Sequence, residues 1–233
     1  MAKKQIRFGN LPEPEYNTKE AFNSLRTNLK FCGKDIQAIL ITSCLPDEGK
    51  SETAIQLARA MGEDGQKVVI MDADLRKSVF VGQHRLEVEG EIMGLTHFLT
   101  GQSNYDDIVY HTDIKGVDMI LSGHTTPNPT ALLGSGAFLE LLDRLRKEYD
   151  VVLVDSPPLG AVIDAAVIAP HCDGAMLVIE TNRISHKFAQ EIKKQLSLAD
   201  CRVLGVVLNK VVPDKHGYYN RYYQGYYKEY SND

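Results

Sequence analysis

Short apolar runs alternate with amphipathic segments along most of the chain. The apolar runs are continuous rather than alternating and lie at residues 36–42, 68–71, 117–121, 151–154, 175–179 and 203–208. Apolar residues at helical spacing predict helices over residues 18–31, 53–61, 130–147, 164–169 and 185–198, with Pro129 and Ser185 as helix starts. Continuous apolar strands are typical of a parallel sheet covered by helices on both faces. The pattern therefore predicts an α/β fold with a mostly parallel central sheet.

The chain length of 233 residues suits one large domain with two appendages. Residues 1–17 contain Pro12 and Pro14 and show little periodicity, so we expect an N-terminal arm there rather than a core element. Residues 18–213 hold the alternation of strands and helices and form the expected domain. Residues 214–233 are rich in tyrosine and are expected to form a flexible tail.

Composition argues against several classes of function. The apolar fraction of 43% and the charged fraction of 24% are ordinary, and the net charge of -5 gives no general attraction to nucleic acid or anionic lipid. The sequence has no apolar stretch of the ~18 residues that a membrane span needs, and its start does not read as a secretory signal. Four cysteines and seven histidines lack metal-ligand spacing. We expect a cytoplasmic protein that binds no nucleic acid and inserts into no membrane.

The segment SCLPDEGKSET follows the first apolar run and precedes a predicted helix. A loop between strand and helix that ends in Gly-Lys-Ser directs backbone N–H groups and the positive end of the helix dipole at a phosphate. In such a P-loop the lysine bridges two phosphates and the serine hydroxyl completes a Mg²⁺ shell. Cys44 stands where the strict pattern has glycine, and a chance Gly-Lys-Ser at a helix start is the alternative. The expected nucleotide-binding residues are Pro46, Asp47, Glu48, Gly49, Lys50, Ser51 and Glu52.

Carboxylates follow two further apolar runs. VVIMDADLR contains Asp72 and Asp74, and VVLVDSPP ends its run at Asp155. A single aspartate after a strand is more often a turn or cap residue, but the carboxyl ends of parallel strands meet at one edge, so the three acids are expected to converge with Lys50. Asn209 follows the last run, where it suits either a hydrogen bond to an adenine edge or a plain turn.

These motifs together resemble the bacterial tyrosine kinases, or BY-kinases, of the CpsD/CapB type. The resemblance spans nearly the whole chain: DEGKS in the P-loop, DADLRK, VDSPPLG, TPNPTALLGS, GVVLNK and the tyrosine-rich tail. It implies a P-loop fold and a kinase that uses ATP and Mg²⁺ and regulates capsule or exopolysaccharide synthesis and export.

The resemblance also implies roles and partners. Lys50 and Ser51 correspond to ligands of ATP and Mg²⁺, Asp74 and Asp155 to metal-organising carboxylates, and Asp72 to the base that receives the proton of the tyrosine hydroxyl. The implied partners are a membrane-anchored activator of the polysaccharide chain-length regulator type, which recruits the kinase to the inner face of the membrane, and a tyrosine phosphatase. A homo-oligomer is implied as well, with Glu20 and Arg26 as contacts, although Asn23 replaces an arginine of the family's pattern.

Seven of the eleven tyrosines lie in the last sixteen residues: Tyr218, Tyr219, Tyr222, Tyr223, Tyr226, Tyr227 and Tyr230. Their four-residue spacing would also suit an aromatic stripe on a packed helix. Gly217, Gly225 and the polar residues between the tyrosines favour instead a mobile tail whose tyrosines accept phosphate. We expect autophosphorylation there, with the tail of one molecule entering the site of another.

Two other functions fit part of the sequence. A nucleotide-switch ATPase of the ParA/MinD type would explain the P-loop and the acids but not the tail, and residues 44–46 lack the extra lysine of that group. A nucleotide-binding regulatory subunit without activity would not need Lys50, Asp72, Asp74 and Asp155 together.

Overall fold

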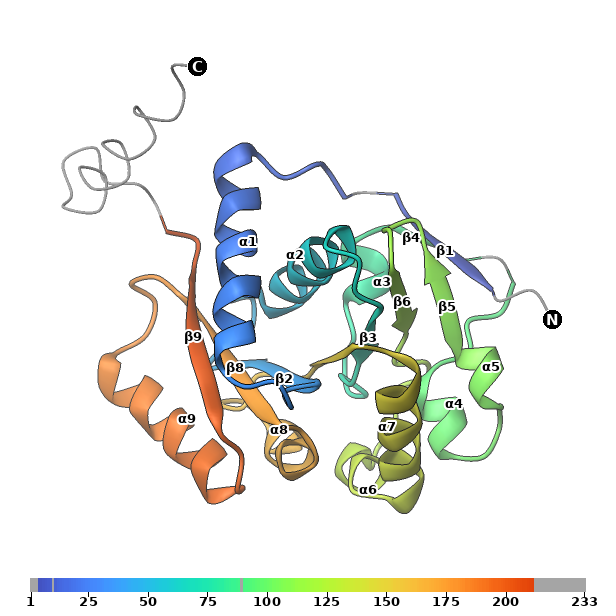
Figure 1. Cartoon of the computed structure of the whole chain (residues 1–233). Coiled ribbons are helices and arrows are strands. Elements are labelled where there is room, and N and C mark those ends of the chain that lie inside the picture. Colours follow the sequence, from blue (N-terminus) through green and yellow to red (C-terminus); the bar gives the residue numbers. More distant parts are fainter. Residues whose placement is uncertain (1–3, 10, 89, 212–233) are drawn as a thin grey trace, which may run out of the picture.

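A single nine-stranded sheet forms the centre of the described structure, a computed structural model in which residues 4–9, 11–88 and 90–211 are described. The strand order is β4-β1-β5-β6-β3-β7-β2-β8-β9 (Figure 1). The strands are β1 (Gln5–Phe8), β2 (Ala38–Ser43), β3 (Val68–Asp72), β4 (Leu86–Val88), β5 (Val109–Thr112), β6 (Val117–Ile120), β7 (Val151–Asp155), β8 (Gly174–Glu180) and β9 (Val203–Asn209).

Six neighbouring strands, from β6 to β9 in the sheet order, run parallel to one another. β5 pairs antiparallel with β6, and β1 lies between β5 and β4 at the other end of the sheet. The six parallel strands correspond to the six apolar runs in the sequence. The expected mostly parallel α/β fold is confirmed.

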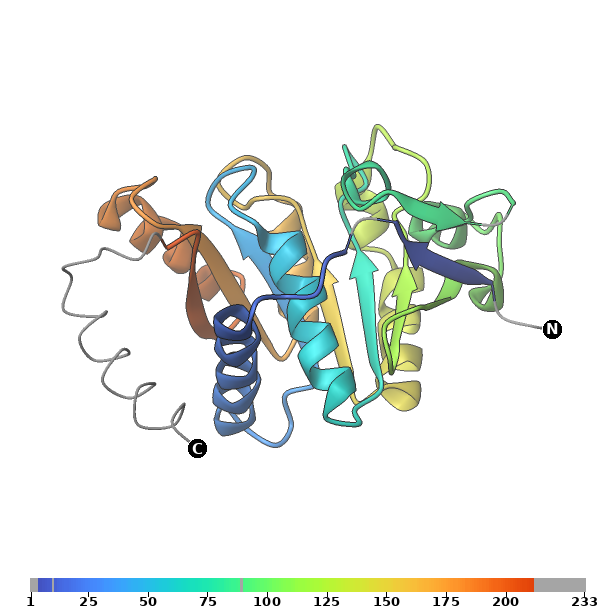
Figure 2. The same ribbon diagram turned by 90° about the horizontal axis from the view of Figure 1, so that it is seen from above.

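Helices cover both faces of the sheet (Figure 2). One face carries α1 (Tyr16–Phe31), α2 (Lys50–Glu63) and α3 (Phe80–Gln83). The other face carries α4 (Leu95–Leu99), α5 (Tyr105–Ile108), α6 (Pro129–Leu133), α7 (Gly136–Glu148), α8 (Asp164–Ile168), the 3-10 helix η1 (Ala169–His171) and α9 (His186–Leu198). Buried side chains of the central strands alternate between two apolar cores, one per face. Within the described residues, no helix is both long and apolar enough to cross a membrane.

The helix predicted over residues 130–147 is two helices. α6 ends at Leu133, and α7 begins after Ser135, whose hydroxyl accepts a hydrogen bond from the Phe138 N–H at 3.3 Å. Gly134 and the capping serine interrupt a segment that is otherwise periodic, and a serine in extended conformation is a strong helix start. The predicted starts at Pro129 and Ser185 are confirmed.

The prediction of an arm over residues 1–17 is wrong for its first part. Gln5–Phe8 forms β1, which pairs with both β4 and β5, and Ile6 is only 1% exposed. β1, β4 and β5 are three or four residues long, and Ile6 is the only residue of β1 that is fully buried. Strands this short leave no hydrophobic run to detect.

Asp173 connects the start of β2 to α7 at the end of the sheet that is remote from the phosphate loop. Its Oδ2 accepts hydrogen bonds from the Gln37 and Ala38 N–H groups, at 2.8 and 2.7 Å, and from Arg146 at 2.7 Å. Burial alone would raise the pKa of Asp173, but the bonds from Arg146 and the two backbone groups hold this pKa below its usual range. The carboxylate therefore stabilises the fold in its ionised form.

Asp173→Asn is expected to lower the free energy of unfolding by about 1–2 kcal/mol at pH 7, because the charge-assisted bonds are lost. The lowered pKa means that this contribution is present above the unfolded pKa of about 4 and is lost as the pH falls through the folded pKa. Urea unfolding at pH 7 and pH 3 measures both values. The exposed Asp35→Asn is the control, and an equal effect of Asp173→Asn at both pH values would contradict the assignment.

Candidate active site

The phosphate loop connects β2, in the middle of the parallel strands, to α2. Gly49 adopts a left-handed conformation at φ 86°, and α2 begins at the next residue with no side chain capping its N-terminus. The first N–H groups of a helix lack intrahelical partners, and together with the helix dipole they favour an anion. The sequence prediction of a loop followed by a helix at Gly-Lys-Ser agrees with this arrangement.

The carboxylates converge on this loop. Asp72 ends β3 and Asp155 ends β7, and the two are direct partners in the parallel register. Both are nearly inaccessible, at 1% and 3% exposure. Asp155 accepts a hydrogen bond from the Ser51 hydroxyl and is within electrostatic reach of Lys50 and Asp74. The structure thus brings Lys50, Ser51, Asp72, Asp74 and Asp155 to one place.

Burial raises the pKa of both strand-end acids. The pKa of Asp72 rises to about 7, first because the carboxyl is desolvated and then because Asp155 is close. The pKa of Asp155 rises to about 6 by desolvation, against the lowering effects of Lys50 and Ser51. Two neighbouring carboxyls that resist ionisation form a site that favours a cation.

The loop after β3 fixes the orientation of its own acids. Asp72 accepts hydrogen bonds from the Asp74 N–H at 3.1 Å and from the Ser78 hydroxyl at 2.5 Å. Asp74 Oδ1 accepts from the N–H groups of Arg76 and Lys77, at 3.1 and 2.9 Å. β3 ends at Asp72, and Asp74 lies in the loop that follows, before the turn at residues 75–77.

Arg76 connects the loop after β3 to the start of α8. Its guanidinium donates two hydrogen bonds to the fully buried carboxylate of Asp164 at the start of α8, at 2.6 and 2.8 Å. Such a bidentate pair fixes geometry as well as charge. The sequence pattern assigned no role to either residue, since no spacing along the chain links positions 88 residues apart.

Some of the residues predicted to bind nucleotide brace the loop. The side chain of Glu48 is fully buried and accepts hydrogen bonds from the N–H groups of Leu45 at 2.7 Å and Glu180 at 3.2 Å. Asn209 donates to the Glu48 carbonyl at 2.9 Å, and Lys210 donates to the Asp47 carbonyl at 2.7 Å. The ends of β8 and β9 therefore hold the loop, and Asn209 is neither a plain turn residue nor free of partners.

The contact between Asn209 and the phosphate loop requires glycine at position 49. A Cβ atom there would lie 2.1 Å from the Asn209 amide nitrogen, and φ is positive. An L-residue would have to push Asn209 off the loop. The glycine of Gly-Lys-Ser thus permits both the turn and the brace.

Two further residues of the segment SCLPDEGKSET make contacts of their own. Glu52 accepts a hydrogen bond from Gln56 at 2.8 Å along the surface of α2, so its carboxylate points along the helix. Cys44 is fully buried, and burial raises the pKa of its thiol to about 12. A thiol that stays protonated is a poor nucleophile, so Cys44 acts as a small neutral residue in the glycine position.

The residues present fit a magnesium ion. Asp155 Oδ1 is buried and has no hydrogen-bond partner, although Ser51 donates to the same carboxylate. Among the described residues, no cluster of three His, Cys, Asp or Glu side chains forms a metal cage. Mg²⁺ usually binds one or two carboxylates together with phosphate oxygens and water, so a hydroxyl and an unsatisfied carboxylate beside a phosphate loop suit it.

The proposed oligomer contacts lie on α1. The Arg26 guanidinium donates to the Ala60 carbonyl at 2.9 Å and pairs with Asp64 at 3.2 Å, both on the neighbouring α2 region of the same chain. Glu20 accepts a hydrogen bond from Asn23 at 3.0 Å. A role of Glu20 and Arg26 between subunits stays a prediction, and the seven tail tyrosines lie outside the described residues.

Comparisons with known proteins show the family to which the chain is similar. Residues 47–201 match the family described as AAA domain. The tyrosine-protein kinase CpsD of Streptococcus agalactiae is 39% identical over 83% of this chain and 84% of its own length, and CpsD of Streptococcus pneumoniae is 38% identical over 88% and 90%.

Solved structures give the same result. The chimerical protein CapA2B2 superposes with a TM-score of 0.78 at 32% identity and covers 83% of this chain and 85% of that one. MinD of Pyrococcus horikoshii has a TM-score of 0.63 at 23% identity over 77% and 72%, which shows a shared fold alone. The chain therefore belongs to the bacterial tyrosine-protein kinase family that includes CpsD.

Proposed function

We propose that this protein-tyrosine kinase holds ATP on the loop before α2 and transfers its γ-phosphoryl group to tyrosines, with Asp72 as the base that takes the proton of the tyrosine hydroxyl. The acceptors include the tyrosines between residues 218 and 230. One observation carries the proposal: Lys50, Ser51, Asp72 and Asp155 meet at the carboxyl ends of adjacent parallel strands. Phosphoryl transfer depends mainly on positioning and on neutralising charge, and this arrangement supplies both.

Lys50 and the N-terminus of α2 hold the phosphates. The lysine supplies positive charge, and the uncapped N–H groups supply hydrogen bonds. The loop keeps its shape because Glu48, Asn209 and Lys210 fix its backbone. Asn209 thereby contributes to ATP affinity through the loop, as a positioning residue.

Ser51, Asp155 and Asp74 are the proposed magnesium ligands, directly or through water. A magnesium ion held there would supply positive charge that neutralises the phosphates during transfer. The unpaired Asp155 Oδ1 supports this assignment, because a buried carboxylate oxygen without a partner is costly unless a ligand satisfies it.

Asp72 is the proposed general base. Its orientation is fixed by the Ser78 hydroxyl and the Asp74 N–H, and burial raises its pKa to about 7, which suits a group that takes up a proton near neutral pH. The proton of the tyrosine hydroxyl passes to Asp72, the tyrosine oxygen bonds to the γ-phosphorus, and the bond from that phosphorus to ADP breaks.

The tyrosine cluster is the proposed acceptor. Asn209, the last residue of β9, and Lys210, the residue after it, contact the phosphate loop, so the described part of the chain ends close to the site. We propose that the segment enters a neighbouring molecule. Each added phosphate brings about -1.5 to -2 charge at pH 7, which weakens further binding next to ATP and acids.

The proposed cellular setting has support from the relatives. We propose that the kinase is cytoplasmic and regulates capsule or exopolysaccharide synthesis, with a membrane-anchored activator of the chain-length regulator type that recruits it to the inner face of the membrane. A tyrosine phosphatase would reverse the modification. Relatives named CpsD and CapB support this setting. The likeness to MinD is one of fold and does not favour a nucleotide switch.

Lys50→Met is expected to reduce tyrosine phosphorylation by at least about a hundredfold, since it removes charge that the transition state needs. The purified variant and the wild type are incubated with Mg-ATP, and phosphopeptide mapping and ADP release are measured together. The exposed Lys34→Met is the control.

Transfer between molecules is tested by mixing Lys50→Met with the wild type. Label on residues 218–230 of the inactive chain supports transfer in trans. ADP release without phosphotyrosine in the wild type would refute the kinase assignment.

Asp155→Asn keeps an acceptor for the Ser51 hydroxyl but removes the charge that faces the metal. We expect the magnesium concentration for half-maximal activity to rise by about tenfold or more. A titration of phosphotyrosine formation against Mg²⁺ measures it, and an unchanged midpoint would remove Asp155 from the metal site.

Asn209→Ala is expected to raise the KM for ATP about tenfold, which corresponds to about 1.4 kcal/mol, because it removes a partly buried hydrogen bond to the loop. The KM for the acceptor peptide should not change. Asn28→Ala, at an exposed position on α1, is the control. If Asn209→Ala raised the KM for the acceptor peptide as much as the KM for ATP, Asn209 would not act through the phosphate loop alone.

A further inference from the structure

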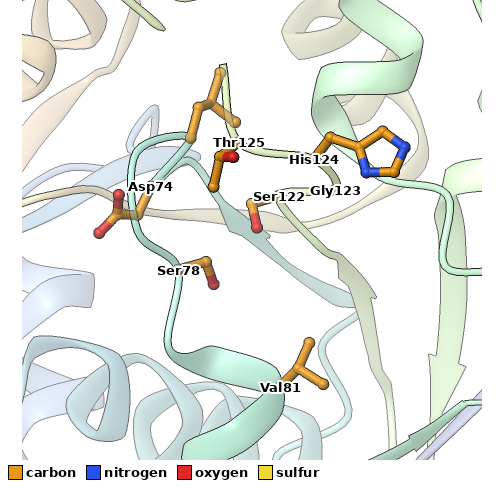
Figure 3. Close-up of a pocket in the computed structure, with 8 residues that line it drawn as sticks. Asp74, Ser78, Val81, Ser122, Gly123, His124 and Thr125 are labelled. Atoms are coloured by element: carbon orange, nitrogen blue, oxygen red, sulfur yellow. The ribbon is translucent and has the colours of Figure 1, made fainter. Parts of the chain in front are cut away.

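A large cavity lies at the end of the parallel strands opposite to the phosphate loop. Its volume is about 810 Å³, and it is found where β3, β6 and β7 begin and where β5 ends. A smaller cavity beside Asp74 and Ser78 lies at the carboxyl ends of the same strands, with the candidate active site (Figure 3). None of the residues assigned above to ATP, magnesium or proton transfer lines the large cavity. It is therefore a separate site.

Three lysines from separate segments line the large cavity, and we call them the lysine cluster. Lys67 precedes β3, Lys115 lies between β5 and β6, and Lys147 lies in the last turn of α7. All three are exposed, and none of them forms an ion pair with a carboxylate among the residues that the structure describes. Each ammonium group offers three hydrogen-bond donors and no acceptor. The cluster therefore favours an anionic ligand.

Two glycines fix the positions of two of these lysines relative to each other. A Cβ atom at Gly62, near the end of α2, would lie 2.0 Å from the Lys115 carbonyl oxygen. A Cβ atom at Gly116, where φ is 74°, would lie 2.8 Å from the Gln66 carbonyl oxygen. Any larger residue at either position would push the turn before β6 away from the segment before β3. The wall that carries Lys67 and Lys115 is thus preformed.

The carboxylates of the cavity wall already have donors. Asp118 accepts a hydrogen bond from the Tyr149 hydroxyl at 2.7 Å, and Glu148 accepts one from the Tyr105 hydroxyl at 2.7 Å. Asp113 accepts from the last backbone N–H of β1 at 3.3 Å. Burial, and then Asp118, raise the pKa of Tyr149, so its hydroxyl stays a donor to this carboxylate. These bonds hold the acids in the wall, and the lysines are left for a ligand.

The lining also contains apolar surface. Ile114, Val117 and Tyr149 line the cavity and are at most 8% exposed. Lysine binds phosphate as a compact point charge, and three lysines from different segments can surround more than one phosphate group. A ligand with an aromatic or aliphatic body and several negative charges fits this lining.

Phosphorylated tyrosine pairs combine these two properties. The tyrosine-rich segment contains Tyr-Tyr pairs at residues 218–219, 222–223 and 226–227. Two adjacent phosphotyrosines would carry about -3 to -4 charges at pH 7, which matches the three positive charges of the lysine cluster. An unmodified pair carries no charge and has no such attraction to the cavity.

The end of the described chain indicates which molecule supplies the segment. Val211 follows the carboxyl end of β9, the fourth strand from β3 in the sheet, whereas the cavity lies at the amino ends. A strand spacing of ~4.8 Å and a rise of ~3.3 Å per residue put these two places roughly 25 Å apart in a straight line through the sheet. Tyr218 is the seventh residue after Val211, and seven residues span at most ~25 Å, too little to pass around the domain. The first tyrosine pair can therefore reach this cavity only in another molecule.

We propose that the large cavity binds phosphorylated tyrosine pairs from the C-terminal segment of a second molecule of this protein. The inference rests on the proposed function, because it needs this segment to be the phosphate acceptor. A modified segment held at the amino ends of the strands is kept away from the carboxyl ends, where transfer takes place. Product binding at the large cavity thus leaves the active site open to the next unmodified segment.

A synthetic peptide of residues 214–233, phosphorylated at Tyr218 and Tyr219, tests the proposal without depending on the activity of the kinase. It is titrated by fluorescence anisotropy against Lys50→Met protein, whose own tyrosines are expected to stay unmodified. The phosphopeptide should bind at least about tenfold more tightly than the unmodified peptide, because only its phosphates pair with the lysines. Its Kd should rise with salt concentration, since exposed ion pairs are screened.

Substitution of the lysine cluster locates the binding site. A triple variant with glutamine at all three positions should raise the Kd of the phosphopeptide at least about tenfold, because the charges that face the phosphates are lost. In an otherwise wild-type chain, the same triple change should leave phosphorylation of the unmodified peptide unchanged. The matched control makes the same change in charge on α9, where three exposed lysines are replaced by glutamine: Lys187, Lys193 and Lys194.

Four results would overturn the proposal. They are equal binding of the modified and unmodified peptides, an unchanged Kd in the lysine-cluster variant, an equal loss in the α9 control, and binding of dextran sulfate but not of phosphopeptide through the lysine cluster. The last result would assign the cavity to an anionic polysaccharide. Failure of the wild type to form phosphotyrosine would instead refute the proposed function, and the synthetic peptide would still report on the cavity.

Discussion

The parallel register of β3 and β7 is the constraint on which the site depends. It sets Asp72 opposite Asp155, each at the last residue of its strand, so two carboxylates end at the same level. β2 pairs with the other side of β7 and continues from Ile41, the partner of Asp155, to Ser43. The phosphate loop therefore begins beyond the carboxylates and returns over them, which lets Ser51 reach Asp155.

This register also creates an electrostatic conflict that the neighbouring residues reduce. Two adjacent buried carboxyls resist ionisation. The Ser78 hydroxyl and the Asp74 N–H stabilise the charge on Asp72, and Lys50 and Ser51 stabilise that on Asp155. Asp155 Oδ1 is left buried without a hydrogen-bond partner, and a bound ligand would remove this remaining unfavourable contribution. Strain of this kind is tolerated where it serves binding.

The central strands, the phosphate loop and the convergence of Lys50, Asp72 and Asp155 were predictable because each leaves a local signal. A buried parallel strand is a continuous apolar run, and its carboxyl end is where polar residues of a site appear. The short strands β1, β4 and β5 leave no such signal, and the capped break at Ser135 is a single residue in a periodic segment.

Contacts between distant segments were not predictable. The brace by Asn209, the pair between Arg76 and Asp164 and the bond from Ser78 to Asp72 depend on tertiary geometry. A motif can place Asn209 at the end of a strand, but only the fold decides that its amide meets the loop backbone rather than solvent.

The brace also makes an outer strand part of the nucleotide site. β9 is the last strand of the sheet, its Val206 and Leu208 side chains are exposed, and the residues at its end hold the loop. Fraying of this edge and loosening of the loop are therefore coupled, so an interaction that opposes one of them also opposes the other. A ligand bound to the loop should therefore slow hydrogen exchange of the backbone amides of β9. By the same coupling, a molecule that binds and stabilises β9 should raise the affinity of the loop for its ligand.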